Sequence, residues 1–162
     1  MCIRDRLEVD TSPDQHRVHA KADKDAEALV PAAVKADGVL TVATTPFSAP
    51  LDFYADDNAT PIGNETDIAQ LVADGLGLEL ELVPTDWANW PLATQSGDVD
   101  VTISNVTVTE ERKQLFDFSS YRVDELGFLA QAGSDLTVDE PADVAGLTIA
   151  VGSGTNLSLI HI

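Results

Sequence analysis

The 162-residue chain carries 28 acidic and nine basic side chains, so its formal net charge is −19 at pH 7, and 44% of its residues are hydrophobic. This acidity argues against nucleic acid as a partner, because no basic stripe replaces the counterions of phosphate. It favours a zwitterionic or cationic ligand over a dianion and fits a saline or extracellular setting. The length suits about one domain, and no apolar run approaches the ~18–20 residues of a membrane span.

The two ends of the chain are hexapeptides whose codons can be reverse complements of each other. Residues 1–6 read MCIRDR and residues 157–162 read LSLIHI, as in a transposase library adapter translated at both edges of an assembled DNA fragment. We expect both hexapeptides to be adapter-derived and exclude them from the fold. The single cysteine, Cys2, lies in the first hexapeptide, so neither a disulfide framework nor a thiolate metal site is expected.

A polar leader precedes the first predicted helix. Residues 7–26 hold few large apolar side chains, and we expect a disordered linker. His16 and His19 lie in this leader without a third metal ligand, so we predict no metal site there. A short helix is predicted at residues 28–35, with Pro31 near its start.

Strands and helices are then predicted in alternation. The predicted elements are a strand at 38–44, a proline-rich loop at 45–62, a helix at 66–76, a strand at 78–83, a helix at 88–95 and a strand at 98–103. Gly77 and Gly97 suit the ends of the two helices. This order is typical of an α/β fold with a parallel-type sheet covered by helices on both faces. In such sheets the ligand crevice lies beyond the carboxyl ends of the strands.

A lone arginine follows the last of these strands. Thr109 is a good N-cap for a helix, Glu110 and Glu111 suit its first turn, and Arg112 sits in the same turn. No Lys or Arg occurs between Lys35 and Arg112. A guanidinium at a helix start after a strand can receive an anion, because Arg offers a planar fork that matches a carboxylate. A simple pair between Arg112 and a surface acid is the alternative.

Short motifs recur in a fixed order along the chain. They are GVLTV at 38–42, PLDF at 50–53, TDW at 85–87, QSGDVD at 95–100, TVTEERK at 107–113, FDFS at 116–119 and VGSGT at 151–155. In this order and spacing, residues 37–156 resemble an extracellular solute-binding protein of the polar amino-acid uptake family, the soluble receptor of an ABC importer.

The resemblance implies a two-lobed, periplasmic-binding-protein-like fold. It implies a first lobe at residues 27–125, and a crossover with the start of a second lobe at 126–156, including a strand at 147–151. It also implies a monomeric, non-enzymatic receptor outside the cytoplasm, without a cofactor, that passes an amino acid to a membrane permease. The signal or anchor is expected outside this sequence, as is the acid that binds the ligand's ammonium group. We therefore expect weak binding by this chain alone.

The resemblance also implies the ligand-binding residues. They are Phe47, Trp87, Asn105, Thr107, Arg112 and Thr155. Arg112 and the hydroxyl of Thr107 would hold the ligand's α-carboxylate, and Thr155 would reach the same group from the second lobe. Trp87 would pack on the ligand's side chain, whereas Trp90 fits the core better. Asn105 either reaches the ligand or caps its strand, and the register of the Phe47 loop is open.

Other functions remain as alternatives. Several acids suggest paired carboxylates for catalysis, but each fits a structural or solvated role: Asp52, Asp67, Asp86, Asp98, Asp100 and Asp117. The GSGT run at 152–155 lacks the lysine of a phosphate-binding loop. An enzyme similar to the cyclohexadienyl dehydratases, or a sensory module, would use the same scaffold.

Overall fold

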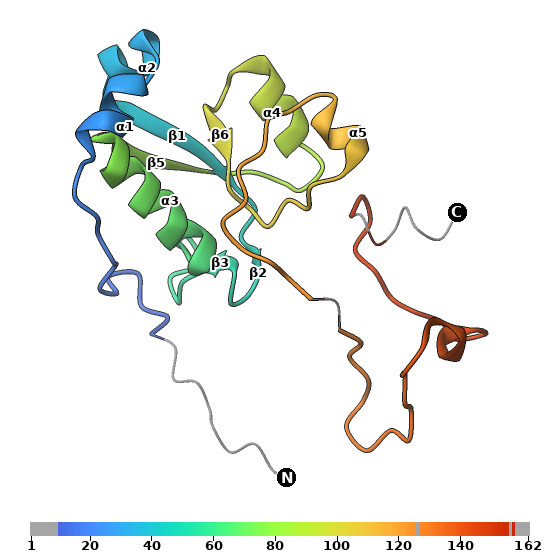
Figure 1. Cartoon of the computed structure of the whole chain (residues 1–162). Helices are drawn as coiled ribbons and strands as arrows, with labels where there is room; N and C mark the ends of the chain where they lie inside the picture. The colour runs from blue at the N-terminus through green and yellow to red at the C-terminus, as the bar shows by residue number, and fades with distance from the viewer. Residues whose placement is uncertain (1–9, 126, 156, 158–162) are drawn as a thin grey trace. The chain divides into compact units, whose positions relative to one another are not determined.

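The computed structural model describes residues 10–125, 127–155 and 157 (Figure 1). The chain divides into two units, Met1–Val106 and Thr107–Ile162. Residues 1–6 and 158–162 of the expected adapter ends lie outside the described residues, so their origin stays a prediction. The predicted lobe boundaries also stay predictions. Among the described residues, no helix is long and apolar enough to cross a membrane.

A three-stranded parallel sheet forms the centre of the first unit (Figure 1). The middle strand, β1 (Val39–Thr44), lies between β5 (Glu79–Pro84) and β6 (Val101–Thr102). β1 pairs with β5 along its whole length, from Val39 opposite Glu79 to Thr44 opposite Pro84. Its apolar sequence VLTVAT suits a strand that is buried on both faces. The predicted parallel α/β sheet is confirmed.

Helices α3 (Asn64–Leu76) and α4 (Trp90–Ser96) cover opposite faces of this sheet. Val101 of β6 packs against the core cluster that contains buried residues of α3. The next residue, Thr102, hydrogen-bonds through its hydroxyl to the hydroxyl of Thr94 in α4 at 2.7 Å. Since successive side chains of a strand point to opposite faces, the two helices lie on opposite sides. The core on the α3 side contains Leu40, Val42, Ala69, Ala73, Leu78 and Ile103.

The helices before β1 differ from the prediction. Instead of one helix at residues 28–35, the chain forms α1 (Lys24–Leu29) and α2 (Ala32–Asp37). Pro31 precedes α2 and supplies no N–H, which ends α1 and starts the next helix. The side chain of Asp23 caps α1 by accepting a hydrogen bond from the backbone N–H of Asp25 at 2.9 Å. Gly77 and Gly97 end α3 and α4 in the left-handed conformation, as predicted.

A second, small antiparallel sheet lies in the stretch that the sequence predicted as a loop. Its strands are β2 (Phe47–Ser48), β3 (Asp52–Tyr54) and β4 (Pro61–Ile62), in the order β2-β3-β4. Strands of two or three residues are too short to display a period-two pattern, and the prolines of this region indicate turns. For that reason sequence periodicity missed this sheet.

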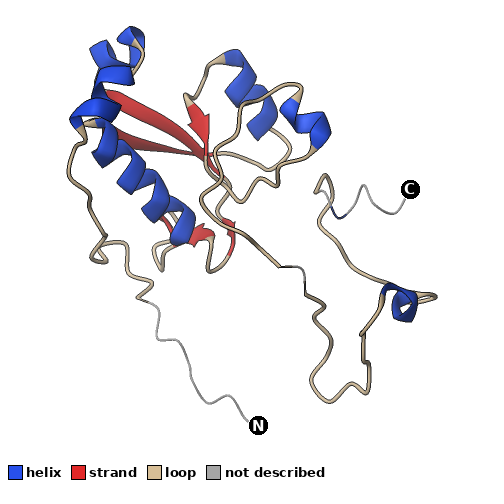
Figure 2. Ribbon diagram, viewed as in Figure 1, coloured by secondary structure: helices blue, strands red, loops and turns tan. Residues whose placement is uncertain are grey.

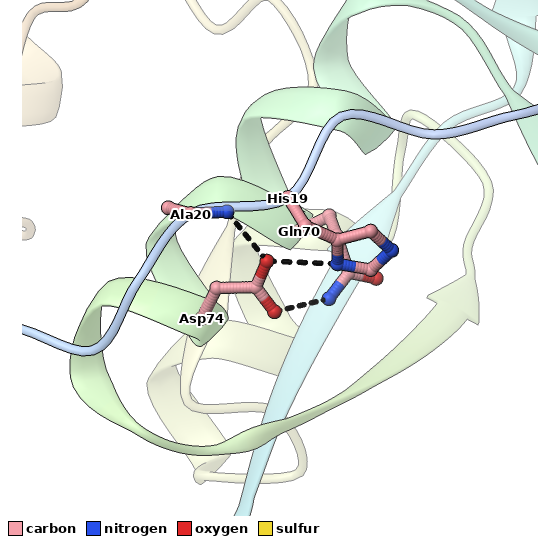
Figure 3. A network of polar contacts seen from close by, with 4 residues as sticks. All are labelled: His19, Ala20, Gln70 and Asp74. Carbon is pink, nitrogen blue, oxygen red and sulfur yellow. Dashed lines mark hydrogen bonds and ion pairs between the residues drawn. The ribbon is translucent and has the colours of Figure 1, made fainter.

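The described part of the leader is hydrogen-bonded to the rest of the first unit. The carboxylate of Asp74 in α3 accepts hydrogen bonds from the backbone N–H of Ala20 at 2.9 Å and from the side-chain amide of Gln70 at 2.8 Å, and it contacts the ring nitrogen of His19 at 2.9 Å (Figure 3). Further hydrogen bonds join Thr11 to Asp56 and Arg17 to the carbonyl of Pro61. The leader residues that make these contacts are mostly polar, and their polar composition is also what predicted a linker.

The second unit contains little regular structure among its described residues (Figure 2). It holds the short helix α5 (Glu110–Lys113) and the 3-10 helix η1 (Pro141–Val144). The strand predicted at residues 147–151 is not formed. The sequence alternates there, but a strand requires a neighbouring strand for its backbone hydrogen bonds, and the described residues of this unit supply none.

Candidate functional site

Buried polar side chains gather at the carboxyl ends of β1 and β6. Thr44, Thr45, Asp52 and Ser104 are all buried. The backbone N–H of Thr45 donates to Asp52 Oδ2 at 2.9 Å and to Ser104 Oγ at 3.0 Å. The hydroxyl of Thr44 donates to Asp52, and the hydroxyls of Thr45 and Ser104 hydrogen-bond to each other. This edge of the sheet is where ligands bind in open α/β folds.

Asp52 is the acid at the centre of this cluster. Burial raises the pKa of its carboxyl group, while hydrogen bonds from Thr44, Thr45 and Ser104 oppose the rise. The negative charge of Glu65 adds a smaller upward contribution to the same pKa. The net effect is a raised pKa, so the neutral form of Asp52 is more favoured in the protein than in water, because a buried charge loses its solvation.

Asn105 directly follows this cluster. Its backbone adopts a φ of 52°, in the left-handed region that Asn tolerates better than most residues. Its backbone N–H donates to Oε2 of Glu65 at 3.2 Å. Glu65 is fully buried in the first turn of α3. This hydrogen bond connects the turn after β6 to the first turn of α3.

Aromatic side chains lie on the loops that leave this edge. Phe47 in β2 is 69% exposed, and its ring meets that of Tyr54 edge-on, with centroids 6.2 Å apart. Trp87 is half-buried in the loop after β5, and its ring centroid lies 6.3 Å from that of Trp90. Trp90 is only 4% exposed. The structure therefore places Trp90 in the core and leaves Phe47 and Trp87 with surface that a ligand can contact.

Arg112 and Thr107 meet at the start of α5 in the second unit. Thr109 caps this helix as predicted, and its hydroxyl oxygen accepts a hydrogen bond from the backbone N–H of Arg112 at 3.3 Å. Nη1 of Arg112 donates to the carbonyl oxygen of Thr107 at 2.8 Å. Partial burial lowers the pKa of the guanidinium, which stays charged at neutral pH because an arginine side chain loses its proton only in strong base. The neighbouring Lys113 instead forms an ion pair with Glu110 at 2.7 Å.

The predicted site residues fall into separate places. Phe47, Trp87 and Asn105 belong to the first unit, and Thr107 and Arg112 lie together in the second. Thr155 donates through its hydroxyl to the carbonyl of Gly152 at 2.7 Å. Within the part of the chain that the structure describes, no three His, Cys, Asp or Glu side chains are grouped to hold a metal ion.

Sequence reasoning missed the buried carboxylates beneath the site. The sequence predicts a structural or solvated role for Asp52, and no pattern in it singles out Glu65. Both are nonetheless fully enclosed. The only sequence signal was the position of Asp52 inside the PLDF motif, and a motif does not report burial. Contacts between distant segments produce this arrangement.

The comparison with known proteins identifies the family. The model of the bacterial extracellular solute-binding proteins, family 3, matches residues 40–152. The L-cystine-binding protein TcyJ of Escherichia coli (strain K12) is 36% identical over 124 residues, which cover 76% of this chain and 46% of TcyJ. The chain thus spans about half the length of this curated relative.

The chain is also similar to a solved structure and, over a shorter stretch, to an enzyme. The arginine-bound form of domain 1 from TmArgBP has a TM-score of 0.54 and 30% identity, covering 56% of this chain and 71% of that one. A cyclohexadienyl dehydratase of Pseudomonas aeruginosa is 33% identical over 82 residues, or 51% of this chain and 30% of the enzyme. The matched family model covers most of the chain. The chain belongs to family 3 of the bacterial extracellular solute-binding proteins.

Proposed function

We propose that this chain forms the first lobe, and the start of the second, of an extracytoplasmic receptor for an amino acid or a similar small zwitterion. The receptor closes two lobes on its ligand by a hinge motion and passes it to the membrane permease of an ABC importer. It is a binding protein and not an enzyme. Family membership and the names of the similar proteins, which bind cystine or arginine, support this proposal.

The Arg112–Thr107 turn is the observation that carries the proposal. The guanidinium of Arg112 is partly buried, and its hydrogen bond to a backbone carbonyl at 2.8 Å orients it. A group held in this way can donate hydrogen bonds to a carboxylate. Pairs between a charged guanidinium and a carboxylate are stronger than neutral hydrogen bonds and add geometric selectivity. We propose that Arg112 and the hydroxyl of Thr107 hold the ligand's α-carboxylate.

The remaining residues are proposed to contact the rest of the ligand. Trp87 and Phe47 offer half-buried and exposed aromatic surface for the ligand's side chain. Asn105 lies three residues after β6, and its side-chain amide is proposed to hydrogen-bond the ligand. Thr155 is proposed to contribute a hydroxyl from the second lobe. An acidic protein of this kind favours ligands with a positive group.

Calorimetry on the full-length protein with a panel of L-amino acids, including arginine and cystine, tests the proposal. We expect saturable binding of at least one member of the panel. A protein that binds none of them would contradict the receptor function.

An enzyme on the same scaffold is the second candidate, favoured by the similarity to cyclohexadienyl dehydratase. Such an enzyme needs an acid that faces the bound substrate to eliminate water from it. Turnover of prephenate by the full-length protein would support this function, and binding of amino acids without any turnover would exclude it.

A further inference from the structure

The two carboxylate oxygens of Asp52 have different surroundings. Oδ2 accepts hydrogen bonds from the hydroxyl of Thr44, from the backbone N–H of Thr45 at 2.9 Å and from the hydroxyl of Ser104 at 3.4 Å. Oδ1 is buried and has no hydrogen-bond partner among the described residues. Since Asp52 is only 2% exposed, a surface role in solubility does not explain an acid at this position.

The three donors belong to strand ends that are distant in sequence. Thr44 is the last residue of β1 and Thr45 follows it, Ser104 lies two residues after β6, and Asp52 itself begins β3. One oxygen atom thus joins the ends of two parallel strands to the small antiparallel sheet. Buried polar groups that are joined in this way specify a single arrangement of the backbone, because any other arrangement leaves a donor unpaired.

Two of the proposed ligand-binding residues, Phe47 and Asn105, lie close in sequence to the hydrogen-bonded residues Thr45 and Ser104. The backbone N–H of Phe47 donates at 2.8 Å to the carbonyl of Thr45, the residue directly after β1. Asn105 follows Ser104 directly, and its N–H is held by Glu65 at 3.2 Å. A shift of Thr45 or Ser104 therefore moves the backbone that carries Phe47 or Asn105.

The groups around Asp52 determine how it responds to pH. Thr44, Thr45 and Ser104 supply neutral donors from β1 and the end of β6, and Glu65 of α3 is the ionisable group that acts on it electrostatically. Burial and the nearby acid both disfavour a charge on Asp52. A proton on Oδ1 would neutralise the side chain and leave the three hydrogen bonds to Oδ2 in place.

We propose that Asp52 is a positioning residue of the ligand site, which fixes the ends of β1 and β6 and thereby orients Phe47 and Asn105. The role in ligand binding rests on the proposed receptor function, whereas the fixing of the strand ends does not. Asp52→Asn keeps one acceptor oxygen without the charge, and it therefore mimics the neutral acid. Asp52→Ala removes the acceptor.

Amide hydrogen exchange of the 162-residue chain tests the fixing of the strand ends without any ligand. Asp52→Ala is expected to speed exchange at the Thr45 amide about tenfold, the effect of losing one buried hydrogen bond. Asp52→Asn is expected to keep exchange close to the wild-type rate. Leu78→Ala is the control, because Leu78 is a core residue next to the amino end of β5, at the opposite end of the sheet.

Calorimetry of the full-length protein with L-arginine and L-cystine then tests the effect on the site. Asp52→Ala is expected to weaken binding about tenfold, with Asp52→Asn restoring it. Leu78→Ala, at an equal loss of melting temperature, is expected to bind as wild type does. Equal exchange at Thr45 in Asp52→Ala and Leu78→Ala would overturn the proposal, and so would wild-type affinity in Asp52→Ala. A wild-type protein that binds no member of the L-amino-acid panel, these two included, would count against the receptor function and would leave the exchange test decisive for the strand ends.

Discussion

The guanidinium of Arg112 donates a hydrogen bond from Nη1 to the carbonyl oxygen of Thr107 at 2.8 Å. The two residues bracket the N-cap of α5, so the bond closes a small turn around Thr109. A guanidinium carries five N–H donors in one plane, and this bond occupies one of them. This hydrogen bond restrains the plane of the guanidinium, and in the proposed carboxylate-binding role of Arg112 that restraint would lower the entropy cost of binding.

Removal of the cap tests whether the turn prepares the arginine. The Thr109→Ala change deletes the acceptor for the backbone N–H of Arg112. We expect the affinity of the full-length protein for its amino acid to fall about fivefold, since an N-cap contributes about 1 kcal/mol. Calorimetry measures this change, with Thr109→Ser as the control that keeps the hydroxyl. Equal loss in both variants would contradict a capping role.

Substitutions of Trp87 and Trp90 are expected to affect ligand binding and stability differently. Trp90 is buried, and Trp90→Ala is expected to destabilise the 162-residue chain by about 3–5 kcal/mol, as for other large core truncations. Trp87 is half-buried, so Trp87→Ala is expected to weaken ligand binding in the full-length protein with a much smaller loss of stability. Urea unfolding and calorimetry measure the two effects. A stability loss in Trp87→Ala as large as that in Trp90→Ala would assign Trp87 to the core.

Local sequence patterns predicted the main strands and helices of the first unit. Contacts between segments distant in sequence determined the burial of the polar groups, which those patterns do not report. The apolar run before Thr44 and the helical spacing before Gly77 gave β1 and α3, because burial imposes a period on each. The N-cap at Thr109 was also predicted, since capping depends on neighbours in sequence. The burial of Asp52 was not, because it arises from segments far apart in the chain.

The raised pKa of Asp52 predicts a dependence of stability on pH. A carboxyl whose pKa is higher in the folded state than in the unfolded state stabilises the fold below its unfolded value of about 3.9, and this contribution is lost as pH rises through the folded value. The free energy of unfolding of wild type should therefore fall relative to that of Asp52→Asn as pH increases from about 4 towards neutral. Urea unfolding at several pH values checks this. A difference between the two proteins that does not vary with pH would contradict the raised pKa.

The hydrogen bonds between Asp74 and the leader predict that the leader is held less firmly at acidic pH, which is the opposite of the pH dependence expected from Asp52. Hydrogen bonds lower the pKa of Asp74, and the donors are the backbone of Ala20, then the side chains of Gln70 and His19. A lowered pKa gives stabilisation above the unfolded value that is lost as pH falls through the folded one, so acid should loosen the leader. Asp74→Ala should release it at neutral pH and speed cleavage by trypsin after Arg17 and Lys21.

Mass spectrometry of the early tryptic products measures that cleavage. Glu81→Ala is the control, because Glu81 is an exposed acid of β5 on the same unit. Equal cleavage rates in Asp74→Ala and Glu81→Ala would show that Asp74 does not hold the leader.

The affinity of the Arg112→Ala variant of the full-length protein tests the central claim most directly. Calorimetry with the L-amino acid that wild type binds should show a loss of roughly 10- to 100-fold, the contribution of hydrogen bonds to a charged group. Lys113→Ala removes the neighbouring cation, which pairs with Glu110, and should leave the affinity unchanged. Unchanged binding in Arg112→Ala would contradict the assignment of this guanidinium to the ligand's carboxylate.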